Sequence, residues 1–250
     1  MIEYLKNIYR SLRIRFRFFV SVNWIKTYYF NYKKFPFSIA KKLPVFFYGR
    51  AKFSSIKGDF IIDAPTKRAM IGFGQRYELV SRSKKTAQIV MNGTFVFKGH
   101  VQFGIDYFIF IADKAYCEFG HLASMASSGK IICKEKIVLG DYARIGSEAQ
   151  LIDTNFHQMI NTETGEKYLM NAPIHIGNYN FISNRVTILQ KTKTPDNCTI
   201  ASNTLCNKDY TKFGENILIG GIPAKLLKEN ISRDWEGEKA GLNEYLIINR

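Results

Sequence analysis

An apolar residue recurs at almost every sixth position across residues 174–228, and this spacing limits what the chain can fold into. The positions in phase are Ile176, Ile182, Ile188, Thr194, Ile200, Cys206, Lys212 and Leu218. Helices repeat a face about every 3.6 residues and strands about every two, so a period of six suits neither an amphipathic helix nor a plain hairpin. It is typical of a β-helix, in which three hexads make one triangular coil and the spaced aliphatic residues stack inward.

The same period runs through the preceding part of the chain. One line of hexads is Ile89, Phe95, Val101 and Tyr107, with a break at Asp113 and a resumption at Phe119, Met125, Ile131 and Ile137. A second line, offset by two residues, follows Leu139, Ile145 and Leu151, which predicts a short insertion or a corner adjustment near residues 134–138. The competing interpretation is a set of unrelated short strands joined by Asn/Gly turns.

Three stretches of the last hexads resemble a known family. The runs IGNYNFISNRVTIL, TIASNTLCNKD and GIPAKLLK are similar to the final coils of the left-handed β-helix acyltransferases, among them the sugar O-acetyltransferases of capsule and lipopolysaccharide clusters and the galactoside and maltose acetyltransferases. The resemblance covers roughly residues 45–228. It implies a mainly β, left-handed parallel β-helix that uses acetyl-CoA as co-substrate, with no permanently bound cofactor. It also implies a homotrimer with the acyl donor in the cleft between adjacent solenoids.

Residues 156–173 interrupt the hexads and are expected to form a loop, where chemistry often lies. His157, in LIDTNFHQ, matches the family's general base. Such a base is needed because an alcohol attacks a thioester slowly until its proton is removed, and histidine has a suitable pKa for removing it. The resemblance further implies that the backbone amide of Asn184 stabilises the oxyanion. Asp153 could orient the imidazole, although a backbone carbonyl could do so equally well. Without the resemblance, His157 reads as a histidine in a surface loop.

The resemblance also places coenzyme A on the last coils. The residues that it implies for binding the pantetheine arm and the nucleotide are Asn184, Ser202, Asn207, Lys208, Lys225 and Lys228. The chain has no Gly-rich GxxxxGK[ST] loop, which argues against a nucleotide triphosphatase.

The net charge of +15 is concentrated at the start of the chain. Residues 1–50 contain eleven Lys or Arg, one acid and fifteen aromatic residues. A nucleic-acid groove spread over the main domain is therefore not indicated. The basic, aromatic segment 1–44 is expected either to contact an anionic membrane surface or to cap the solenoid, and no apolar run reaches the roughly 18 residues that span a bilayer.

The cysteines and histidines do not suggest a metal site. Cys117, Cys133, Cys198 and Cys206 lack short CxxC spacing, which favours reduced thiols and a cytoplasmic setting. The four histidines lack the close pair expected of a γ-type carbonic anhydrase, a metalloenzyme on the same solenoid. Residues 229–250 are expected to form a helical tail that closes the C-terminal end or packs on a neighbouring chain.

The sequence thus predicts an acetyl-CoA-dependent O-acetyltransferase that acts on a sugar hydroxyl in surface polysaccharide biosynthesis, at the capsule, O-antigen or exopolysaccharide. Two alternatives remain: an N-acyltransferase acting on an amino sugar, and a non-catalytic solenoid scaffold recruited to a membrane.

Overall fold

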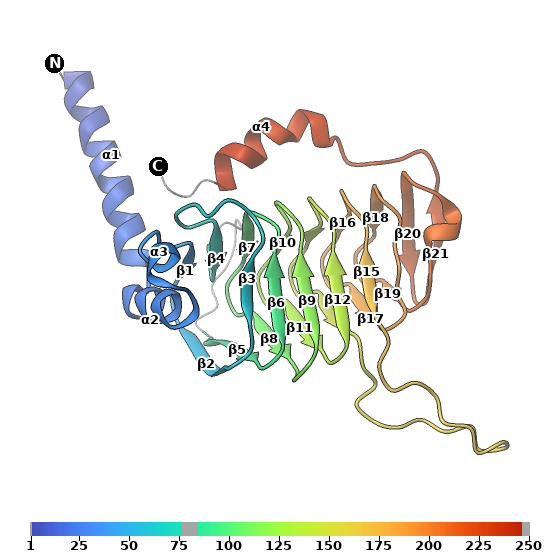
Figure 1. Cartoon of the computed structure of the whole chain (residues 1–250). Coiled ribbons are helices and arrows are strands. Elements are labelled where there is room, and N and C mark those ends of the chain that lie inside the picture. Colours follow the sequence, from blue (N-terminus) through green and yellow to red (C-terminus); the bar gives the residue numbers. More distant parts are fainter. Residues whose placement is uncertain (1, 77–84, 247–250) are drawn as a thin grey trace.

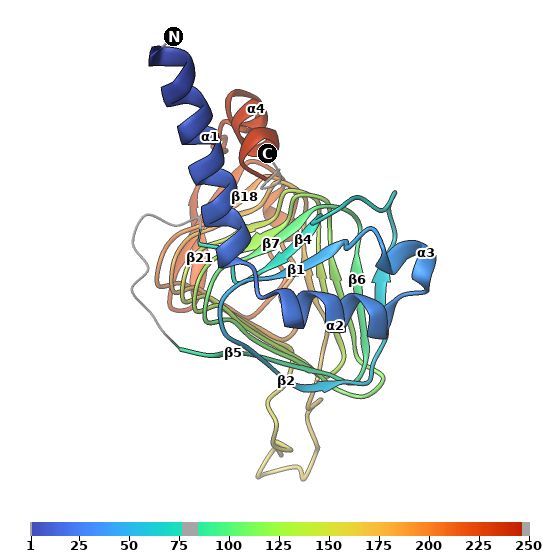
Figure 2. The same cartoon turned by 90° about the vertical axis from the view of Figure 1, so that its left-hand side faces the viewer.

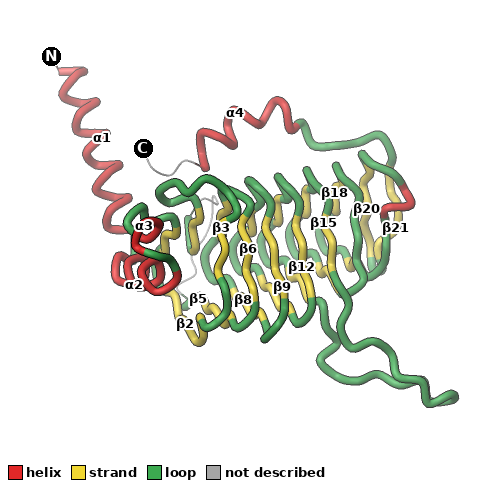
Figure 3. The backbone as a smooth tube through the Cα atoms, viewed as in Figure 1, coloured by secondary structure: helices red, strands yellow, loops and turns green. Residues whose placement is uncertain are grey.

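The computed structural model describes residues 2–76 and 85–246, and its main body is a three-sided parallel β-helix (Figure 1). Each successive coil adds strands to three sheets that run the length of the solenoid. Figure 2 shows the solenoid from its N-terminal end, and Figure 3 marks the strands on the backbone. The prediction of a left-handed parallel β-helix is confirmed.

The three sheets are named I, II and III here. Sheet I contains β1 (Val45–Phe47), β4 (Ile71–Phe73), β7 (Val101–Phe103), β10 (Ser124–Met125), β13 (Arg144–Ile145), β16 (Phe181–Ile182), β18 (Cys198–Ile200), β20 (Ile217–Gly221) and β21 (Ala224–Lys228). Sheet II contains β2 (Ala51–Ile56), β5 (Ala87–Met91), β8 (Phe108–Ile111), β11 (Lys130–Cys133), β14 (Gln150–Ile152), β17 (Thr187–Leu189) and β19 (Leu205–Cys206). Sheet III contains β3 (Phe60–Ile62), β6 (Thr94–Phe97), β9 (Tyr116–Phe119), β12 (Lys136–Leu139) and β15 (Ile174–Ile176).

Coil length varies at the corner between sheets II and III. The step from Ile131 in sheet II to Val138 in sheet III is seven residues. In a later coil the equivalent residues are Ile188 and Lys193, and the step between them is five residues. The predicted corner adjustment near residues 134–138 is therefore confirmed. The two offset lines of apolar residues both face the core, because alternate residues of a strand share one face.

The six-residue repeat holds as far as Cys206 and then fails. Lys212 is exposed and Leu218 is half-buried, whereas Ile217 and Ile219 are fully buried. The reason is local: a short 3₁₀-helix, η1 (Thr211–Phe213), stands where a strand of sheet III would continue the hexads. The chain re-enters sheet I in a different phase.

The core is aromatic at its N-terminal end and aliphatic at its C-terminal end. Phe47 stacks on Phe73 with ring centroids 5.1 Å apart, and Phe73 stacks on Phe103 at 4.5 Å. In the last coils the same column of sheet I continues with Ile182 and Ile200. The early coils also contain more residues, with 30 from Ile71 to the stacked Val101 and 18 from Ile182 to the stacked Ile200.

The N-terminal end of the solenoid is covered by α2 (Trp24–Lys34), which α3 (Phe37–Ala40) follows. Phe30 is buried against Phe47 and Phe60, at ring-centroid distances of 5.1 and 5.0 Å. The buried amide of Asn31 donates to the carbonyl of Val45 at 2.7 Å and accepts from its N–H at 3.2 Å. This helix therefore both shields the first coil and satisfies polar groups at the exposed edge of sheet I.

The preceding helix, α1 (Ile2–Ser21), extends away from the solenoid (Figures 1 and 2). It contacts the body near its last turn, where Phe18 lies 6.1 Å from Phe46 and 6.2 Å from Tyr48 between ring centroids. Of the helices described, none combines the length and the hydropathy needed to cross a bilayer.

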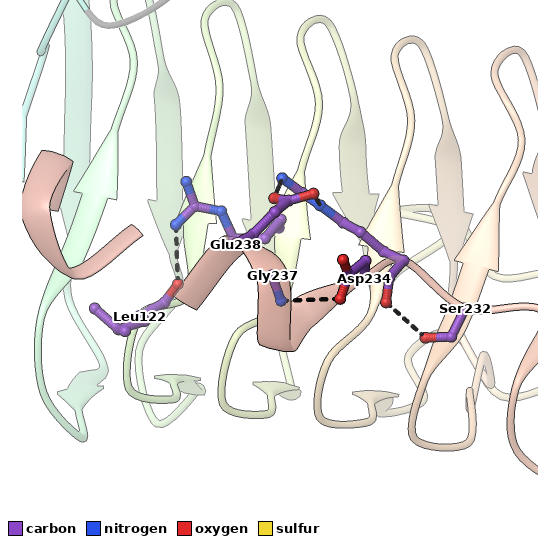
Figure 4. A network of polar contacts seen from close by, with 7 residues as sticks. Leu122, Ser232, Asp234, Gly237 and Glu238 are labelled. Carbon is purple, nitrogen blue, oxygen red and sulfur yellow. Dashed lines mark hydrogen bonds and ion pairs between the residues drawn. The ribbon is translucent and has the colours of Figure 1, made fainter. Parts of the chain in front are cut away.

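The C-terminal tail does not close the solenoid. The antiparallel turn from β20 to β21 ends sheet I, and α4 (Trp235–Leu246) runs back along the side of the coils (Figure 1). Trp235 packs edge-on against Tyr142 and Tyr179, while Arg233 pairs with Glu238 (Figure 4). The expectation that the tail closes the C-terminal end is therefore wrong, because aromatic residues on two neighbouring coils hold it at the side.

Candidate functional site

A hairpin-like arm leaves the solenoid between β14 and β15, at the corner between sheets II and III (Figure 1). Its two sides pair through isolated antiparallel bridges, Thr154 with Asn171 and Ile160 with Lys167. The prediction that a loop interrupts the hexads at residues 156–173 is confirmed. The pairing makes the loop a defined projection on a rigid scaffold.

His157 lies near the base of the arm with an exposed side chain. Its backbone N–H donates to the carbonyl oxygen of Asn155 at 2.7 Å. Among the residues that the structure describes, its imidazole has no hydrogen-bond or ion-pair partner. The ring is therefore accessible to a substrate hydroxyl, and its role as general base stays a prediction.

Asp153 has a different place from the one expected. Its fully buried carboxylate accepts three backbone N–H groups, those of Lys134 at 2.7 Å and of Glu135 and Lys136 at 2.8 Å each. The structure contains no hydrogen bond or ion pair between Asp153 and His157, both of which it describes. The interpretation of Asp153 as the residue that orients the imidazole is corrected accordingly: it clamps the corner of the preceding coil.

Asn184 and Ser202 lie at the opposite corner, between sheets I and II, on neighbouring coils. The carbonyl oxygen of Asn184 accepts from the N–H of Asn203 at 3.1 Å, and its side-chain oxygen accepts from the N–H of Ser147 at 3.0 Å. The backbone N–H of Asn184 itself has no acceptor within the described part of the chain. A free amide donor is what an oxyanion site requires, because it can hydrogen-bond the developing negative charge.

The remaining predicted binding residues do not gather in one place. Asn207 and Lys208 follow β19 at the corner between sheets II and III, where the N–H of Lys193 donates to the carbonyl of Lys208 at 3.3 Å. Lys225 and Lys228 lie on β21, at opposite ends of the last strand of sheet I.

Within one chain, sheet II therefore separates the predicted general base from the predicted oxyanion donor. The Asn184 corner and the His157 corner lie at opposite ends of its short strands, roughly 10 Å or more apart along the sheet. The structure places Asn184 and Ser202 on neighbouring coils, and it places the arm and Lys208 at the same corner, between sheets II and III. It does not bring the predicted base and the predicted oxyanion donor together within a single chain.

The arm also presents an apolar surface, which was not among the predicted functional residues. Its exposed apolar side chains are Phe156, Met159, Ile160, Tyr168 and Leu169, each between 47% and 69% exposed. The signal was present as two apolar pairs, Met-Ile and Tyr-Leu, within a run that is otherwise polar. Exposed apolar groups grouped on one projection are typical of a surface that another molecule covers.

Two of the buried thiols can be set aside as nucleophiles. Burial raises the pKa of the Cys198 and Cys206 thiols to about 12, so neither supplies a thiolate nucleophile near neutrality. Burial also lowers the pKa of His100 and His175. Across residues 2–76 and 85–246, no three His, Cys, Asp or Glu side chains form a metal-binding group.

We expect Asp153→Asn to destabilise the fold by roughly 3 kcal/mol, because the amide loses charge-assisted bonds to three backbone donors and turns its own NH₂ towards them. Urea denaturation measures the loss. Asp141→Asn is the matched control, since among the described residues the exposed carboxylate of Asp141 accepts only the N–H of His121, at 2.6 Å, and the substitution should cost less than about 1 kcal/mol. Equal losses in both variants would contradict the clamp.

No family model matches the sequence, and no curated protein matches it either. Among solved structures, the chain is similar to the polysialic-acid-specific acetyltransferase NeuO, at 14% identity and a TM-score of 0.45, over 82% of this chain and 87% of that one. It is similar to a hexapeptide-repeat acetyltransferase of Vibrio cholerae O1 biovar eltor complexed with acetyl coenzyme A, at 22% identity and a TM-score of 0.39, over 45% of this chain and 60% of that one.

A further similarity is to AntD, an N-acyltransferase of Bacillus cereus, at 12% identity and a TM-score of 0.37, over 84% of this chain and 97% of that one. At these identities and TM-scores the similarities assign neither a family nor an activity to this chain. The six-residue repeat and the three parallel sheets give it the β-helix fold that its sequence predicts.

Proposed function

We propose that the chain is an acyltransferase that moves an acetyl group from acetyl-CoA to a sugar hydroxyl in surface polysaccharide biosynthesis. The observation that carries the proposal is a pair of groups at the two opposite corners that sheet II joins: the backbone N–H of Asn184, which has no acceptor among the described residues, and the exposed imidazole of His157. A donor for an oxyanion and an accessible base are the two groups that direct acyl transfer requires.

In the proposed reaction, Nε2 or Nδ1 of His157 takes the proton of the acceptor hydroxyl while its oxygen attacks the thioester carbonyl. The N–H of Asn184 stabilises the tetrahedral oxyanion. Collapse of the intermediate expels the coenzyme A thiolate, which takes the proton from the imidazolium, so that the products are an ester and free coenzyme A. No covalent enzyme intermediate is needed, and no permanently bound cofactor takes part.

Acetyl-CoA is the proposed donor, held by the last coils. The residues proposed to contact it are Asn184, Ser202, Asn207, Lys208, Lys225 and Lys228, which expose polar or cationic groups that suit an amide-rich arm and a phosphorylated nucleotide.

We further propose a homotrimer, because the predicted groups of one chain lie at opposite corners of sheet II. In a closed ring of three chains, the arm of one solenoid reaches the Asn184 corner of its neighbour. The exposed apolar residues of the arm would be covered there, as an interface requires.

We expect Ile160→Asp/Leu169→Asp to yield a folded monomer without activity, because each residue is more than half exposed in one chain but would be buried between chains. Multi-angle light scattering after gel filtration measures the mass. Ile25→Asp is the control, since Ile25 is 83% exposed on α2, far from the arm, and should leave the trimer intact. A wild-type protein that is monomeric at micromolar concentration would overturn the assembly.

We expect His157→Ala to lower turnover by roughly 10²–10⁴-fold, the usual cost of losing a general base, while coenzyme A affinity stays nearly unchanged. Release of free thiol from acetyl-CoA, measured against nucleotide-linked and lipid-linked sugars, reports turnover, and titration calorimetry reports coenzyme A binding. His175→Ala is the control, because His175 lies on β15 within sheet III.

Two results would contradict the proposal. Intact turnover in His157→Ala would remove the base, and failure of the wild-type chain to bind coenzyme A would favour the non-catalytic scaffold. Treatment of the product with hydroxylamine separates O-acylation from N-acylation of an amino sugar, because an ester is cleaved and an amide is not.

The proposal includes contact of α1 with the cytoplasmic face of an anionic membrane. On this helix Lys6, Arg10, Arg13 and Arg17 form one stripe. The exposed apolar side chains lie opposite it and along one flank: Tyr4, Ile8, Leu12 and Phe19 opposite, Tyr9 and Phe16 on the flank. An amphipathic helix with cations beside its apolar face suits the interface of a membrane with negatively charged lipids. The alternative expectation for residues 1–44, that they cap the solenoid, describes α2, which covers the first coil.

We expect Leu12→Glu/Phe16→Glu to abolish binding to vesicles of phosphatidylcholine and phosphatidylglycerol, because the apolar face of α1 could no longer enter the interface. Co-sedimentation measures binding, which should weaken with salt and disappear with phosphatidylcholine alone. Ile25→Glu/Phe37→Glu is the control, with exposed apolar residues on α2 and α3. Equal partitioning of all three proteins would reject the contact.

A further inference from the structure

A cavity of about 670 Å³ lies where α1 meets the first coils, at the end of the solenoid opposite β21 (Figure 1). The N–H of Gly49 donates to the carbonyl of Ser21 at 3.4 Å, and the amide of Asn23 donates to the carbonyl of Gly49 at 3.0 Å. These bonds attach the end of α1 to the first coil, so one wall of the cavity comes from the helix and the others from the solenoid. None of the residues proposed for acyl transfer lines it.

The lining is strongly cationic. Arg17 comes from α1, Arg50 from the turn between β1 and β2, and Arg76 from the chain after β4, with Lys85 beside them and Asp106 as the acid. Within the described residues no carboxylate pairs with Arg17, Arg50 or Arg76. Three arginines from separate segments that line one cavity suit a phosphate group, which arginine binds through paired hydrogen bonds.

The walls also contain buried polar atoms whose hydrogen bonds are incomplete. Tyr48 and Gln75 are 7% and 5% exposed, and their side chains interact with each other. Within the described residues, however, neither Tyr48 Oη nor Gln75 Oε1 makes a hydrogen bond of ordinary length and angle, and Asp106 Oδ2 has no partner there. Buried polar atoms are nearly always well paired, so this cluster around one cavity indicates a ligand that supplies the missing bonds. Burial raises the pKa of Tyr48 to about 12, so its hydroxyl keeps its proton near neutrality.

The chemistry of the lining narrows the ligand further. The arginines and the Tyr48 hydroxyl are donors for a phosphate, whereas Gln75 Oε1 and Asp106 Oδ2 are acceptors that suit hydroxyl groups. Phe18 and Ile105 add an apolar wall. We propose that this cavity binds a phosphate ester of a polyol, with Arg17, Arg50 and Arg76 on the phosphate and Asp106 and Gln75 on the hydroxyls. The site is independent of acyl transfer and is distinct from the coenzyme A site proposed on the last coils.

Titration calorimetry on the full chain tests the site with three probes: glycerol 3-phosphate, inorganic phosphate and dihexanoyl phosphatidylglycerol below its micelle concentration. We expect one equivalent of glycerol 3-phosphate to bind more tightly than inorganic phosphate. Arg50→Gln/Arg76→Gln should weaken binding at least tenfold, because each lost guanidinium removes charge-assisted hydrogen bonds. Arg10→Gln/Arg13→Gln, on α1 outside the cavity, removes the same charge and should leave affinity unchanged.

A second variant separates a loss of binding from a loss of stability. Tyr48→Phe deletes a hydroxyl that makes no hydrogen bond of ordinary geometry among the described residues and interacts only with Gln75, so we expect the unliganded midpoint of thermal unfolding to change little while affinity for glycerol 3-phosphate falls severalfold. Tighter binding of the dihexanoyl lipid would identify a membrane headgroup as the source of the phosphate, and equal binding would identify a soluble ester.

Three outcomes would overturn the proposal. They are the absence of binding to wild type, an equal loss in Arg10→Gln/Arg13→Gln, and displacement of the probe by coenzyme A. The last would place the probe in the donor site. If His157→Ala lacks activity but binds glycerol 3-phosphate normally, the cavity is independent of acyl transfer. Binding of the probe can be measured even if the chain proves to have no acyltransferase activity, and turnover can be measured even if the probe does not bind.

Discussion

The structure depends on the register with which each coil stacks on the next. Along sheets I, II and III the backbone N–H groups of one coil donate to the carbonyl groups of its neighbour, so equivalent residues form columns through the molecule. In a column such as Phe47, Phe73 and Phe103, every side chain rests on chemically similar side chains above and below. A polar group in such a column must bring its own partners, and Asp153 does so by accepting three amides of the coil beside it.

The columns explain why much of the fold could be read from the sequence. A column needs an apolar residue at a constant interval, so Ile176, Ile182 and Ile188 predict both the coil and its inward face. The interval carries no information where the chain leaves the solenoid. For this reason the six-residue spacing includes Lys212, although this residue lies in η1 and not in a strand. The direction of the C-terminal tail could not be predicted either.

The candidate site was less predictable, because its residues depend on which corner each one reaches. His157 and Asn184 could be selected from motifs, but their separation along sheet II follows from the three-sided cross-section. Asp153 is close to His157 in sequence, and yet its buried carboxylate binds the backbone amides of residues 134–136, since a buried carboxylate is stable only where donors surround it. The unpaired N–H of Asn184 is a property of stacking between coils, and no pattern of residue types records it.

The two ends of the solenoid are closed by different means. A stack of parallel strands ends in rows of unpaired backbone groups, which in principle accept another copy end to end. At the first coil, Asn31 bonds both backbone groups of Val45, and α2 covers the aromatic core. At the last coil, the chain reverses from β20 into the antiparallel β21, whose outward residues include Lys225 and Lys228. Growth of the solenoid into a fibre is thus blocked at both termini, so association of copies is directed to the sides of the prism.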